Sequence, residues 1–456
     1  MAAGARQSPV LFDPRRFQTF RFLARELDAR GRVTLRYALD DEIFFVEEFE
    51  LPLDDDLSDA ELGRAQALLS LLHWVAGVSY FKTAAPAEIS CEAGAPPPAA
   101  AALLEALYSL GLGEFAYANG LPLPRPRFGQ ASGPGSSGSP TATAPKRMLV
   151  AVGGGKDSAV AIEIARRSGR ELGLFSIGDA PAIARTISVA RLPHLLARRR
   201  LDPRLGALNG AGALNGHIPI TAIVSCAALL TARLRGFDTV VMANERSASS
   251  GNVTWEGVEI NHQFSKSIMA ERLLSAAVAE AASGLQLFSI VRPASELAIA
   301  RAFARMLPYH GAFTSCNAIF RLEPSLRART WCGDCPKCRF VFLALAPFSD
   351  PAHMREIFGR DLLEDERQLA GFALLTATGG HKPFECVGEE EESLAAIRML
   401  AADPRWRDHA VVRRLVAEVL PQFPPAAGDP VRALALGEDH AVPAALMPDV
   451  RAVLGA

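Results

Sequence analysis

The chain has 456 residues, of which 49% are hydrophobic and 21% charged, and its formal net charge at pH 7 is −2. This length is enough for about two or three domains with cores of their own, and a charge so close to zero gives no reason to expect nucleic-acid binding. Because no hydrophobic run reaches the ~18 residues that span a bilayer and no signal-peptide core follows the N-terminus, we predict a cytoplasmic protein with no membrane association.

The first part of the chain, residues 1–125, is predicted to be an α+β domain. Its hydrophobic residues alternate as in antiparallel strands and then change to helical spacing. The predicted strands cover residues 17–27, 33–37 and 43–49, and the predicted helices cover 61–78 and about 98–110. Lys82 follows the first helix. It is a candidate contact for an anionic substrate, and the alternative is an ordinary exposed lysine.

A stretch rich in Gly, Ser, Pro and Thr follows over residues 126–146. This composition is typical of a flexible linker or a surface insertion. We predict that it separates the first domain from a second domain over residues 147–345.

The second domain begins with a hydrophobic strand that runs into a glycine turn and a helix. The turn and the first residues of the helix are Gly153, Gly154, Gly155, Lys156, Asp157 and Ser158. Free backbone N–H groups in such a turn, together with the helix dipole, bind phosphate. Asp157 after Lys156 excludes a Walker A loop, and Ser158 stands where a dinucleotide fingerprint needs glycine. We predict a phosphate site of another kind; an ordinary glycine-rich turn is the alternative.

Strands and helices then alternate in the α/β manner. The predicted strands cover residues 171–177, 238–243 and 286–291, and the predicted helices cover 218–234 and 295–306. Asp179, past the first strand, could reach a ribose or could be a plain turn residue. Open α/β sheets bind ligands past the carboxyl ends of their strands. Asn244, Glu245 and Arg246 follow such a strand and are candidates for substrate binding, and His217, at the entry to the helix 218–234, is a further candidate.

The segment 258–267 is too polar for a core element and too poor in Gly and Pro for a plain loop. It carries Asn261, His262, Gln263 and Lys266. One reading is a binding surface for an anionic ligand with many hydrogen-bonding groups. The other is the capped start of a helix, with Ser267 as the N-cap, and both can hold at once.

Three of the seven cysteines, Cys332, Cys335 and Cys338, are spaced C-x2-C-x2-C, and Cys316 lies sixteen residues upstream. An odd number of cysteines in such a cluster fits a metal or a catalytic role better than a disulfide framework. Four thiolates suit tetrahedral zinc, which is the preferred reading. The alternatives are an acid/base role for Cys316 or Cys332, and an iron–sulfur cluster.

The C-terminal region, residues 346–456, is predicted to be mostly helical. Four glutamates precede a hydrophobic helix from Ser393 onward, where the helix dipole favours negative charge. Before them, His381, Lys382 and Cys386 lie on one loop, and loops are where substrate groups tend to bind.

Two resemblances follow from these motifs. Residues 153–158, Gly-Gly-Gly-Lys-Asp-Ser, resemble the PP-loop of ATP pyrophosphatases, S-G-G-x-D-S, with Gly153 in place of the leading serine. Together with Asn244-Glu-Arg-Ser-Ala248, Asn261-His-Gln-Phe-Ser-Lys266, Trp331-Cys-Gly-Asp-Cys-Pro-Lys-Cys338 and His381-Lys-Pro-Phe-Glu-Cys-Val-Gly388, the chain resembles the UDP-N-acetyl-α-D-muramoyl-L-alanyl-L-glutamate epimerases. The likeness extends from about residue 15 to residue 420. It implies an α/β PP-loop domain with a parallel sheet, flanked by the α+β and the helical regions.

The resemblance also implies a reaction and its ligands. ATP would activate the terminal L-glutamate of the UDP-muramoyl dipeptide as an acyl-adenylate, with release of pyrophosphate and AMP, and the residue would emerge as D-glutamate. ATP and Mg²⁺ would bind at residues 153–158 and Asp179, and a separate ligase would add the L-glutamate. The candidates for the acid/base groups are His262, Lys266, Cys316 and Cys386, and the sequence does not rank them. If zinc takes Cys316, that thiol cannot be the base.

Two other functions stay open at this point. A PP-loop enzyme that adenylates RNA or a nucleobase would share the ATP site and the cysteine cluster. Against it stand the slightly acidic charge and the shortness of the basic run 198–200, which we interpret as a solvated helix end. A noncatalytic, zinc-stabilised interaction protein would not need Lys156 and Asp157.

Overall fold

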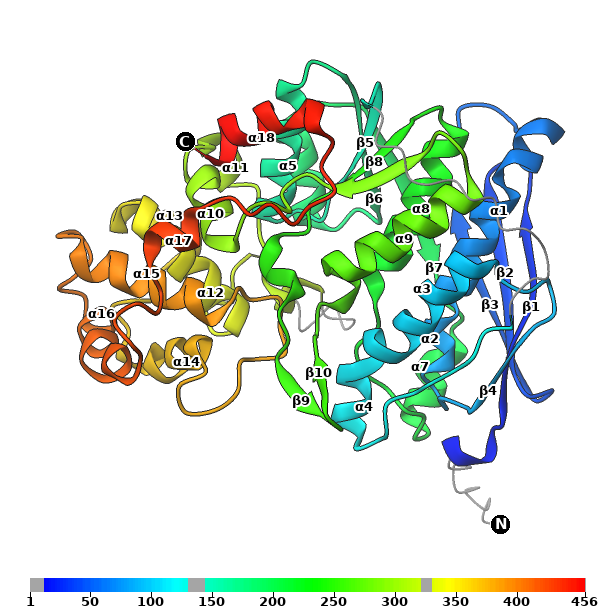
Figure 1. The fold of residues 1–456 in the computed structure, drawn as a ribbon, viewed down its shortest axis with the longest axis horizontal. Helices are drawn as coiled ribbons and strands as arrows, with labels where there is room; N and C mark the ends of the chain where they lie inside the picture. The colour runs from blue at the N-terminus through cyan, green and yellow to red at the C-terminus, as the bar shows by residue number, and fades with distance from the viewer. Residues whose placement is uncertain (1–11, 130–143, 321–329, 456) are drawn as a thin grey trace, which may run out of the picture.

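The computed structural model describes residues 12–129, 144–320 and 330–455 (Figure 1). The predicted linker, 126–146, lies mostly outside them. Where its start is described, Phe128 is buried against Phe22 and Tyr108. The chain is therefore still packed at that residue.

A nine-stranded sheet runs through the fold in the order β11-β8-β5-β6-β7-β3-β2-β1-β4, and β9 and β10 form a separate hairpin. The strands are β1 (Thr19–Leu27), β2 (Arg32–Leu39), β3 (Ile43–Glu50), β4 (Glu88–Cys91), β5 (Arg147–Ala151), β6 (Glu171–Ile177), β7 (His194–Arg200), β8 (Thr239–Met242), β9 (Val253–Trp255), β10 (Val258–Ile260) and β11 (Gln286–Ser289). The five from β11 to β7 are parallel, whereas β7, β3, β2 and β1 pair antiparallel. A mixed α/β fold with a largely parallel sheet is thus confirmed.

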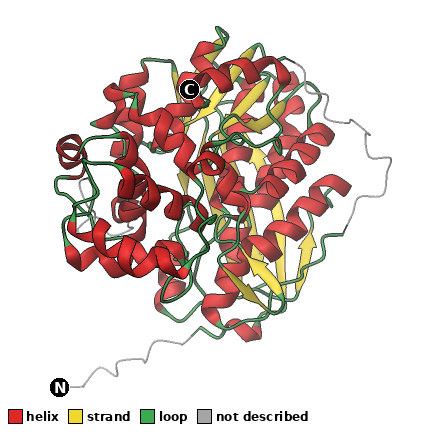
Figure 2. Ribbon diagram, turned by 60° about the vertical axis from the view of Figure 1, so that its left-hand side comes forward, coloured by secondary structure: helices red, strands yellow, loops and turns green. Residues whose placement is uncertain are grey.

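Helices cover both faces of the sheet (Figure 2). They are α1 (Asp59–Ala76), α2 (Val78–Phe81), α3 (Pro98–Ser109), α4 (Gly113–Asn119), α5 (Lys156–Arg167), α6 (Pro181–Ala190), α7 (Arg204–Gly210), α8 (Ile220–Leu234), α9 (Ile268–Ala281), α10 (Glu296–Ala304), α11 (Leu307–His310), α12 (Pro336–Leu345), α13 (Pro351–Phe358), α14 (Leu369–Ala373), α15 (Glu390–Ala402), α16 (Ala410–Arg414), α17 (Pro430–Leu434) and α18 (Met447–Leu454).

The central strand β5 shows why two cores form. Met148 and Val150 pack into the core that contains α5, α10, α12 and α15. Leu149 and Ala151 pack into the opposite core, with α1, α8 and α9. Successive residues of a strand point to opposite faces of the sheet. A strand that is buried on both faces therefore has a continuous run of hydrophobic residues, as β5 has after Arg147.

The strand β7 corrects the prediction of a helix end at residues 198–200. The arginines lie on a strand that pairs with β3, where Arg199 forms an ion pair with the buried Glu47 at 2.5 Å. Arg200 pairs with Glu48 at 3.1 Å. Opposite charges facing one another across strands favour this register, so the basic run joins the N-terminal strands to the parallel strands in one sheet.

The C-terminal helices form a lobe at one end of the sheet, at the left of Figure 1, and α18 returns to pack on α5. The predicted helix start at the glutamates is confirmed, since Glu389 and Glu392 form a capping box at the beginning of α15. The dipole alone does not explain Glu392, because this side chain is buried and accepts hydrogen bonds from Ser247 and from the backbone of Glu296.

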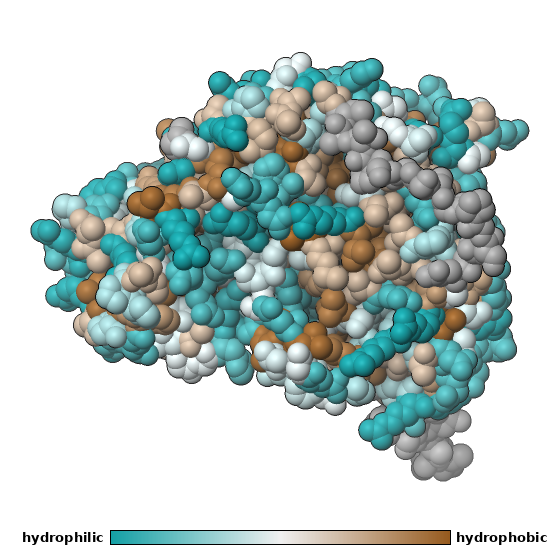
Figure 3. Space-filling model, in the orientation of Figure 1, coloured by the Kyte–Doolittle hydropathy of each residue, from teal (hydrophilic) through white to brown (hydrophobic). Residues whose placement is uncertain are grey.

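One helical stretch, Pro98–Asn119, is long and apolar enough to cross a membrane by length and composition, but 61% of its most apolar window is buried within the fold. The face in Figure 3 mixes hydrophilic and hydrophobic residues. The predicted absence of a membrane association stays a prediction.

Candidate functional site

The glycine loop lies at the carboxyl end of β5 and leads into α5. Gly155 is the N-cap of the helix, and the backbone N–H of Gly153 donates to Ser158 Oγ at 2.9 Å. The Gly154 carbonyl accepts from the N–H of Thr314 at 3.1 Å. Gly153 is exposed, so the loop can receive a ligand from solvent while its far side is held by the rest of the fold. This arrangement suits a phosphate.

Gly154→Ala is expected to lower the pyrophosphate release that the PP-loop resemblance implies by about 100-fold, because a small displacement of a phosphate loop misplaces the reacting atoms. Gly154 has a φ of +82°, and a Cβ there would lie 2.7 Å from the backbone carbon of Ala182. Gly153→Ala is the matched control, since its Cβ would meet only Ser158 Oγ, at 3.8 Å. A steady-state assay of both variants checks this, and equal losses in the two would contradict it.

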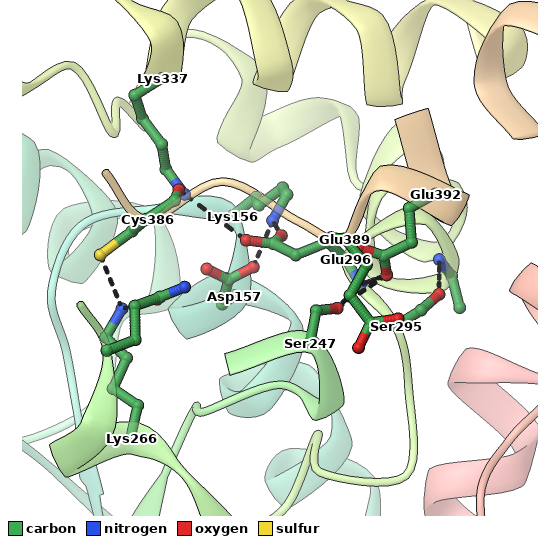
Figure 4. Close-up of polar contacts among 12 residues, drawn as sticks. Lys156, Asp157, Ser247, Lys266, Ser295, Glu296, Lys337, Cys386, Glu389 and Glu392 are labelled. Atoms are coloured by element: carbon green, nitrogen blue, oxygen red, sulfur yellow. Dashed lines mark hydrogen bonds and ion pairs between the residues drawn. The ribbon is translucent and has the colours of Figure 1, made fainter. Parts of the chain in front are cut away.

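A cluster of alternating charges lies below the loop (Figure 4). Lys156 is buried and forms ion pairs with Glu296 and, at 2.5 Å, with Asp157. Lys337, from α12, reaches the other oxygen of Glu296 at 3.4 Å. Burial opposes the charge on Glu296, but Lys156 and Lys337 outweigh it and lower the pKa of Glu296 to about 2. Lys156 thus faces the protein interior, and its charge is balanced there.

Three carboxylates of this cluster could hold a divalent cation. Oxygens of Asp157, Glu245 and Glu296 lie within 4.8 Å of one another. Burial, followed by the charge of Glu296, raises the pKa of Glu245. A cation would relieve that repulsion, and carboxylate oxygens are the ligands that Mg²⁺ prefers. These donors fit the Mg²⁺ that the resemblance implies, which would share Glu296 with Lys156 and Lys337. Of the three carboxylates, only Asp157 belongs to the predicted ATP and Mg²⁺ site.

A second cluster lies next to the first and contains a thiol, two imidazoles, an ammonium group and a carboxylate. Cys386 Sγ lies 3.5 Å from Lys266 Nζ, and Lys266 and His262 lower the pKa of this thiol against the effect of burial. His262 Nδ1 is in contact with Glu114, and its ring lies 4.3 Å from that of His217. Of the four predicted acid/base candidates, the structure brings these three together: His262, Lys266 and Cys386.

The two clusters are physically joined. The ammonium group of Lys337 donates to the backbone carbonyl of Cys386 and also reaches Glu296. One chain of contacts thus runs from the glycine loop, through Lys156, Glu296 and Lys337, to the thiol.

The other predicted substrate residues lie around this centre in different ways. Gln263 accepts from Lys266 at 3.2 Å, and Asn244 is buried past the end of β8. Asn261 bonds the backbone carbonyl of Ala248 at 2.8 Å, a loop-stabilising contact. Arg246 points away from the thiol cluster, to the carbonyl of Ala435 at 3.0 Å.

The last four predicted binding residues differ in their solvent exposure. Lys82 is buried against Asn215, two residues before His217, so the alternative of an exposed lysine is wrong. Lys382 is buried, which lowers its pKa, whereas His381 is exposed. Asp179 is exposed past the end of β6, the neighbour of β5.

Cys316 belongs to a separate cluster with Cys332, Cys335 and Cys338. Their sulfur atoms lie within 4.8 Å of one another, with Cys338 at 3.5 Å from Cys335 and 3.7 Å from Cys332. A tetrahedral zinc with Zn–S bonds of about 2.3 Å requires sulfurs roughly 3.8 Å apart, so the donor set fits zinc. Cys335 also caps α12, the helix that carries Lys337.

Sequence reasoning missed several residues of the site. Glu296 had a local signal, because it opens α10 directly past β11, where ligand groups are expected. Lys337 lies inside the cysteine motif, which drew attention to the thiols alone. Glu114 had no such signal: it opens α4, and its partner His262 lies 148 residues further along the chain.

Residues 11–290 match the family model described as the MurL N-terminal domain, and residues 312–428 match the MurL C-terminal domain. A UDP-N-acetyl-alpha-D-muramoyl-L-alanyl-L-glutamate epimerase from Micromonospora is 48% identical over 417 residues, which cover 89% of this chain and 92% of that protein. Proteins of the same name from Salinispora tropica and Xanthomonas oryzae are 47% and 42% identical, over 89% and 97% of this chain and 90% and 98% of those proteins. None of these three names refers to RNA or a nucleobase, so the alternative of nucleic-acid modification has no support from them.

Proposed function

The chain belongs to the MurL family, and on that premise we propose that it is an ATP-dependent epimerase of UDP-N-acetylmuramoyl-L-alanyl-L-glutamate. It converts the terminal L-glutamate to D-glutamate through an acyl-adenylate, with release of pyrophosphate and AMP. The substrate is a nucleotide-linked cell-wall precursor, which must be supplied by a ligase that adds L-glutamate. The reaction accordingly takes place in the cytoplasm.

The observation that carries this proposal is the contact between the two clusters. A glycine loop of the PP-loop type offers a site for the phosphates of ATP, and a thiol and an imidazole offer proton transfer. Lys337 binds both Glu296 and the backbone of Cys386, so the two sites are held in one unit. Adenylation followed by inversion at the neighbouring carbon needs this proximity.

The chemistry explains the use of ATP. Removing the Cα proton beside a free carboxylate would build a second negative charge on the same group. Forming the acyl-adenylate removes the carboxylate charge and makes the carbonyl a better electron acceptor. A base can then take the proton, and an acid can return one to the opposite face.

The residues divide into three groups by role. Gly154, Gly155 and Ser158 cradle phosphate oxygens, and Asp179, exposed past the end of β6, is our candidate for binding the ribose. Asp157, Glu245 and Glu296 would hold Mg²⁺, which would offset negative charge on the phosphates. The dipeptide is bound near the thiol cluster, with Gln263, His217 and Lys266 in its wall.

The four-cysteine cluster is proposed to hold a structural zinc ion. The purified protein should contain about one zinc per chain, and Cys338→Ser should abolish the zinc and lower thermal stability, because structural sites contribute folding energy outright. Elemental analysis and thermal melts measure both. Cys91→Ser, outside the cluster, is the control and should keep its zinc. A zinc-free wild-type protein with an unchanged melt after chelation would contradict the proposal.

The test of the function is an assay in D₂O with ATP, Mg²⁺ and UDP-N-acetylmuramoyl-L-alanyl-L-glutamate. We expect AMP, pyrophosphate and a D-glutamate that carries one deuterium at Cα. Pyrophosphate release without inversion would support the proposed ATP site but would contradict the proposed epimerisation of this substrate. No turnover of this substrate would contradict the epimerase assignment.

A further inference from the structure

Cys386 has the surroundings of a reactive thiol. It lies on the loop before α15, and the residue is partly exposed. Lys266, at the end of the 3-10 turn Phe264–Lys266, lies 3.5 Å from the sulfur. His262 and Lys337 are the other charged groups that act on it. A sulfur among three cationic groups favours the thiolate, the reactive form.

A carboxylate and a second imidazole hold His262 in place. Its Nδ1 contacts the carboxylate of Glu114, at the start of α4, and His217 lies against its ring. Glu114 also lies 3.9 Å from His217 Nδ1. In catalytic sites with a carboxylate, an imidazole and a thiol in this order, the carboxylate orients the imidazole toward the thiol.

The charges of the pair follow from these contacts. Burial opposes charge on His262, but the hydrogen bonds to Cys386 and Glu114 raise its pKa to about 9. Burial likewise opposes a thiolate, but Lys266 and His262 lower the pKa of Cys386 to about 7. His217, by contrast, has its pKa lowered to about 4, first by burial and then by His262. The surroundings therefore favour a thiolate on Cys386, an imidazolium on His262 and a neutral His217.

We infer that Cys386, with His262 oriented by Glu114, is the base that removes the Cα proton in the epimerisation. The inference rests on the proposed function. The Cα–H bond breaks, its proton passes to the sulfur to give a thiol, and the electron pair enters the enolate of the activated carbonyl. A proton that derives from solvent is delivered to the opposite face of Cα and completes the inversion, and the thiol of Cys386 gives up its own proton to solvent. Cys386 is the catalytic residue in this step, and Glu114 is a positioning residue that acts through His262.

The other candidates fit this role less well. Cys316 is fully buried within the cysteine cluster. In Lys266, burial opposes the charge, but Cys386 and Glu245 raise the pKa, so the group stays protonated and cannot accept a proton. The imidazolium of His262 is also protonated near neutral pH. Among the three acid/base candidates of the thiol cluster, His262, Lys266 and Cys386, the thiolate of Cys386 is the group that can accept a proton.

Two variants and one control test the inference. Cys386→Ser should lower the incorporation of deuterium at Cα by at least about 100-fold, as expected for loss of a general base. It should keep the exchange of labelled pyrophosphate into ATP, because this exchange reports adenylation alone. Cys91→Ser removes a thiol from β4 and should retain both reactions. Circular dichroism checks that each variant is folded.

The pH dependence separates a positioning role from a structural one. In the wild type, alkylation of Cys386 by iodoacetamide should rise with pH through a midpoint near 7, since the thiolate is the form that reacts. In Glu114→Gln the imidazolium loses its carboxylate, the positive charge beside the sulfur weakens, and the pKa of Cys386 rises. The midpoints of alkylation and of kcat should both move to higher pH, with KM little changed.

Three outcomes would overturn the inference. They are deuterium incorporation by Cys386→Ser at the wild-type rate, an unchanged alkylation midpoint in Glu114→Gln, and a substrate-derived acyl adduct on Cys386 by intact mass spectrometry, which would make the thiol a nucleophile. Absence of pyrophosphate exchange in the wild type would instead remove the proposed function itself, so the two failures are distinguishable.

Discussion

We expect the Glu296→Ala variant to be much less stable than the wild type and to lose nearly all of its pyrophosphate release. The side chain is buried and is the shared partner of two ammonium groups, Lys156 and Lys337. Removing one partner of a buried ion pair leaves charge without compensation and costs about 3–5 kcal/mol. The free energy of unfolding, measured by urea denaturation, should fall by this amount. Pyrophosphate release should fall by about 1,000-fold, because a ligand that offsets phosphate charge contributes several kcal/mol.

The controls separate charge from shape. Glu296→Gln keeps the volume but removes the charge, and should lose activity as the alanine variant does. Glu390→Gln changes an exposed glutamate on α15 and should shift the unfolding free energy by less than about 0.5 kcal/mol. A Glu296→Ala protein that keeps wild-type stability would show that Lys156 and Lys337 find other partners, and the proposed role of the cluster would then be wrong.

Arg292→Ala is expected to have an effect of similar size at a residue that touches no substrate. The guanidinium is 1% exposed and binds Glu271 at 2.8 Å. It also donates to the backbone carbonyls of Glu245 and Lys266, each at 2.5 Å. These two residues belong to the carboxylate cluster and to the thiol cluster. Loss of the planar guanidinium group should lower the free energy of unfolding by about 3–5 kcal/mol and should lower kcat.

Three further variants separate the charge of Arg292 from its hydrogen-bonding geometry and from its position. Arg292→Lys keeps the charge but not the planar fork, so its loss of stability should be intermediate. Replacing both Arg292 and Glu271 with methionine removes the buried charges together, and should recover much of the stability but not the activity. Arg272→Ala, on the exposed surface of α9, is the control. Equal activity in the double variant and the wild type would contradict the positioning role.

Local patterns made much of the fold predictable. The glycine turn between β5 and α5, the N-cap Ser267 and the two cores around β5 all follow from hydrophobic spacing and turn chemistry within a few residues. The strand β7 was missed because three consecutive arginines hide the hydrophobic alternation. Their partners, the glutamates of β3, lie some 150 residues earlier, and no local rule connects the two.

The candidate site follows the same division. His262, Lys266 and Cys386 stood out because polar and reactive residues were dense in short segments. Contacts between distant parts of the chain bring these residues together. The same kind of contact places Glu114 beside His262 and gives Lys337 its two partners, and no local pattern predicts either. Burial also changes what a residue can do: Lys156 looked like a phosphate contact, but its ammonium group is enclosed by carboxylates.

The pairing of β3 with β7 has a consequence for the newly made chain. At about 5–20 residues per second, the roughly 150 residues between these strands take about 8–30 s to synthesise. During that interval β1, β2 and β3 can pair with one another while the outer side of β3 has no neighbour. Exposed strand edges recruit other chains, and an inward-pointing charge is one of the features that prevent it. Glu47 supplies such a charge on β3, and it is neutralised when Arg199 arrives. Glu47 thus has two roles in succession: its charge protects the edge of the unfinished sheet against pairing with other chains, and it later pairs with Arg199 where β3 meets β7.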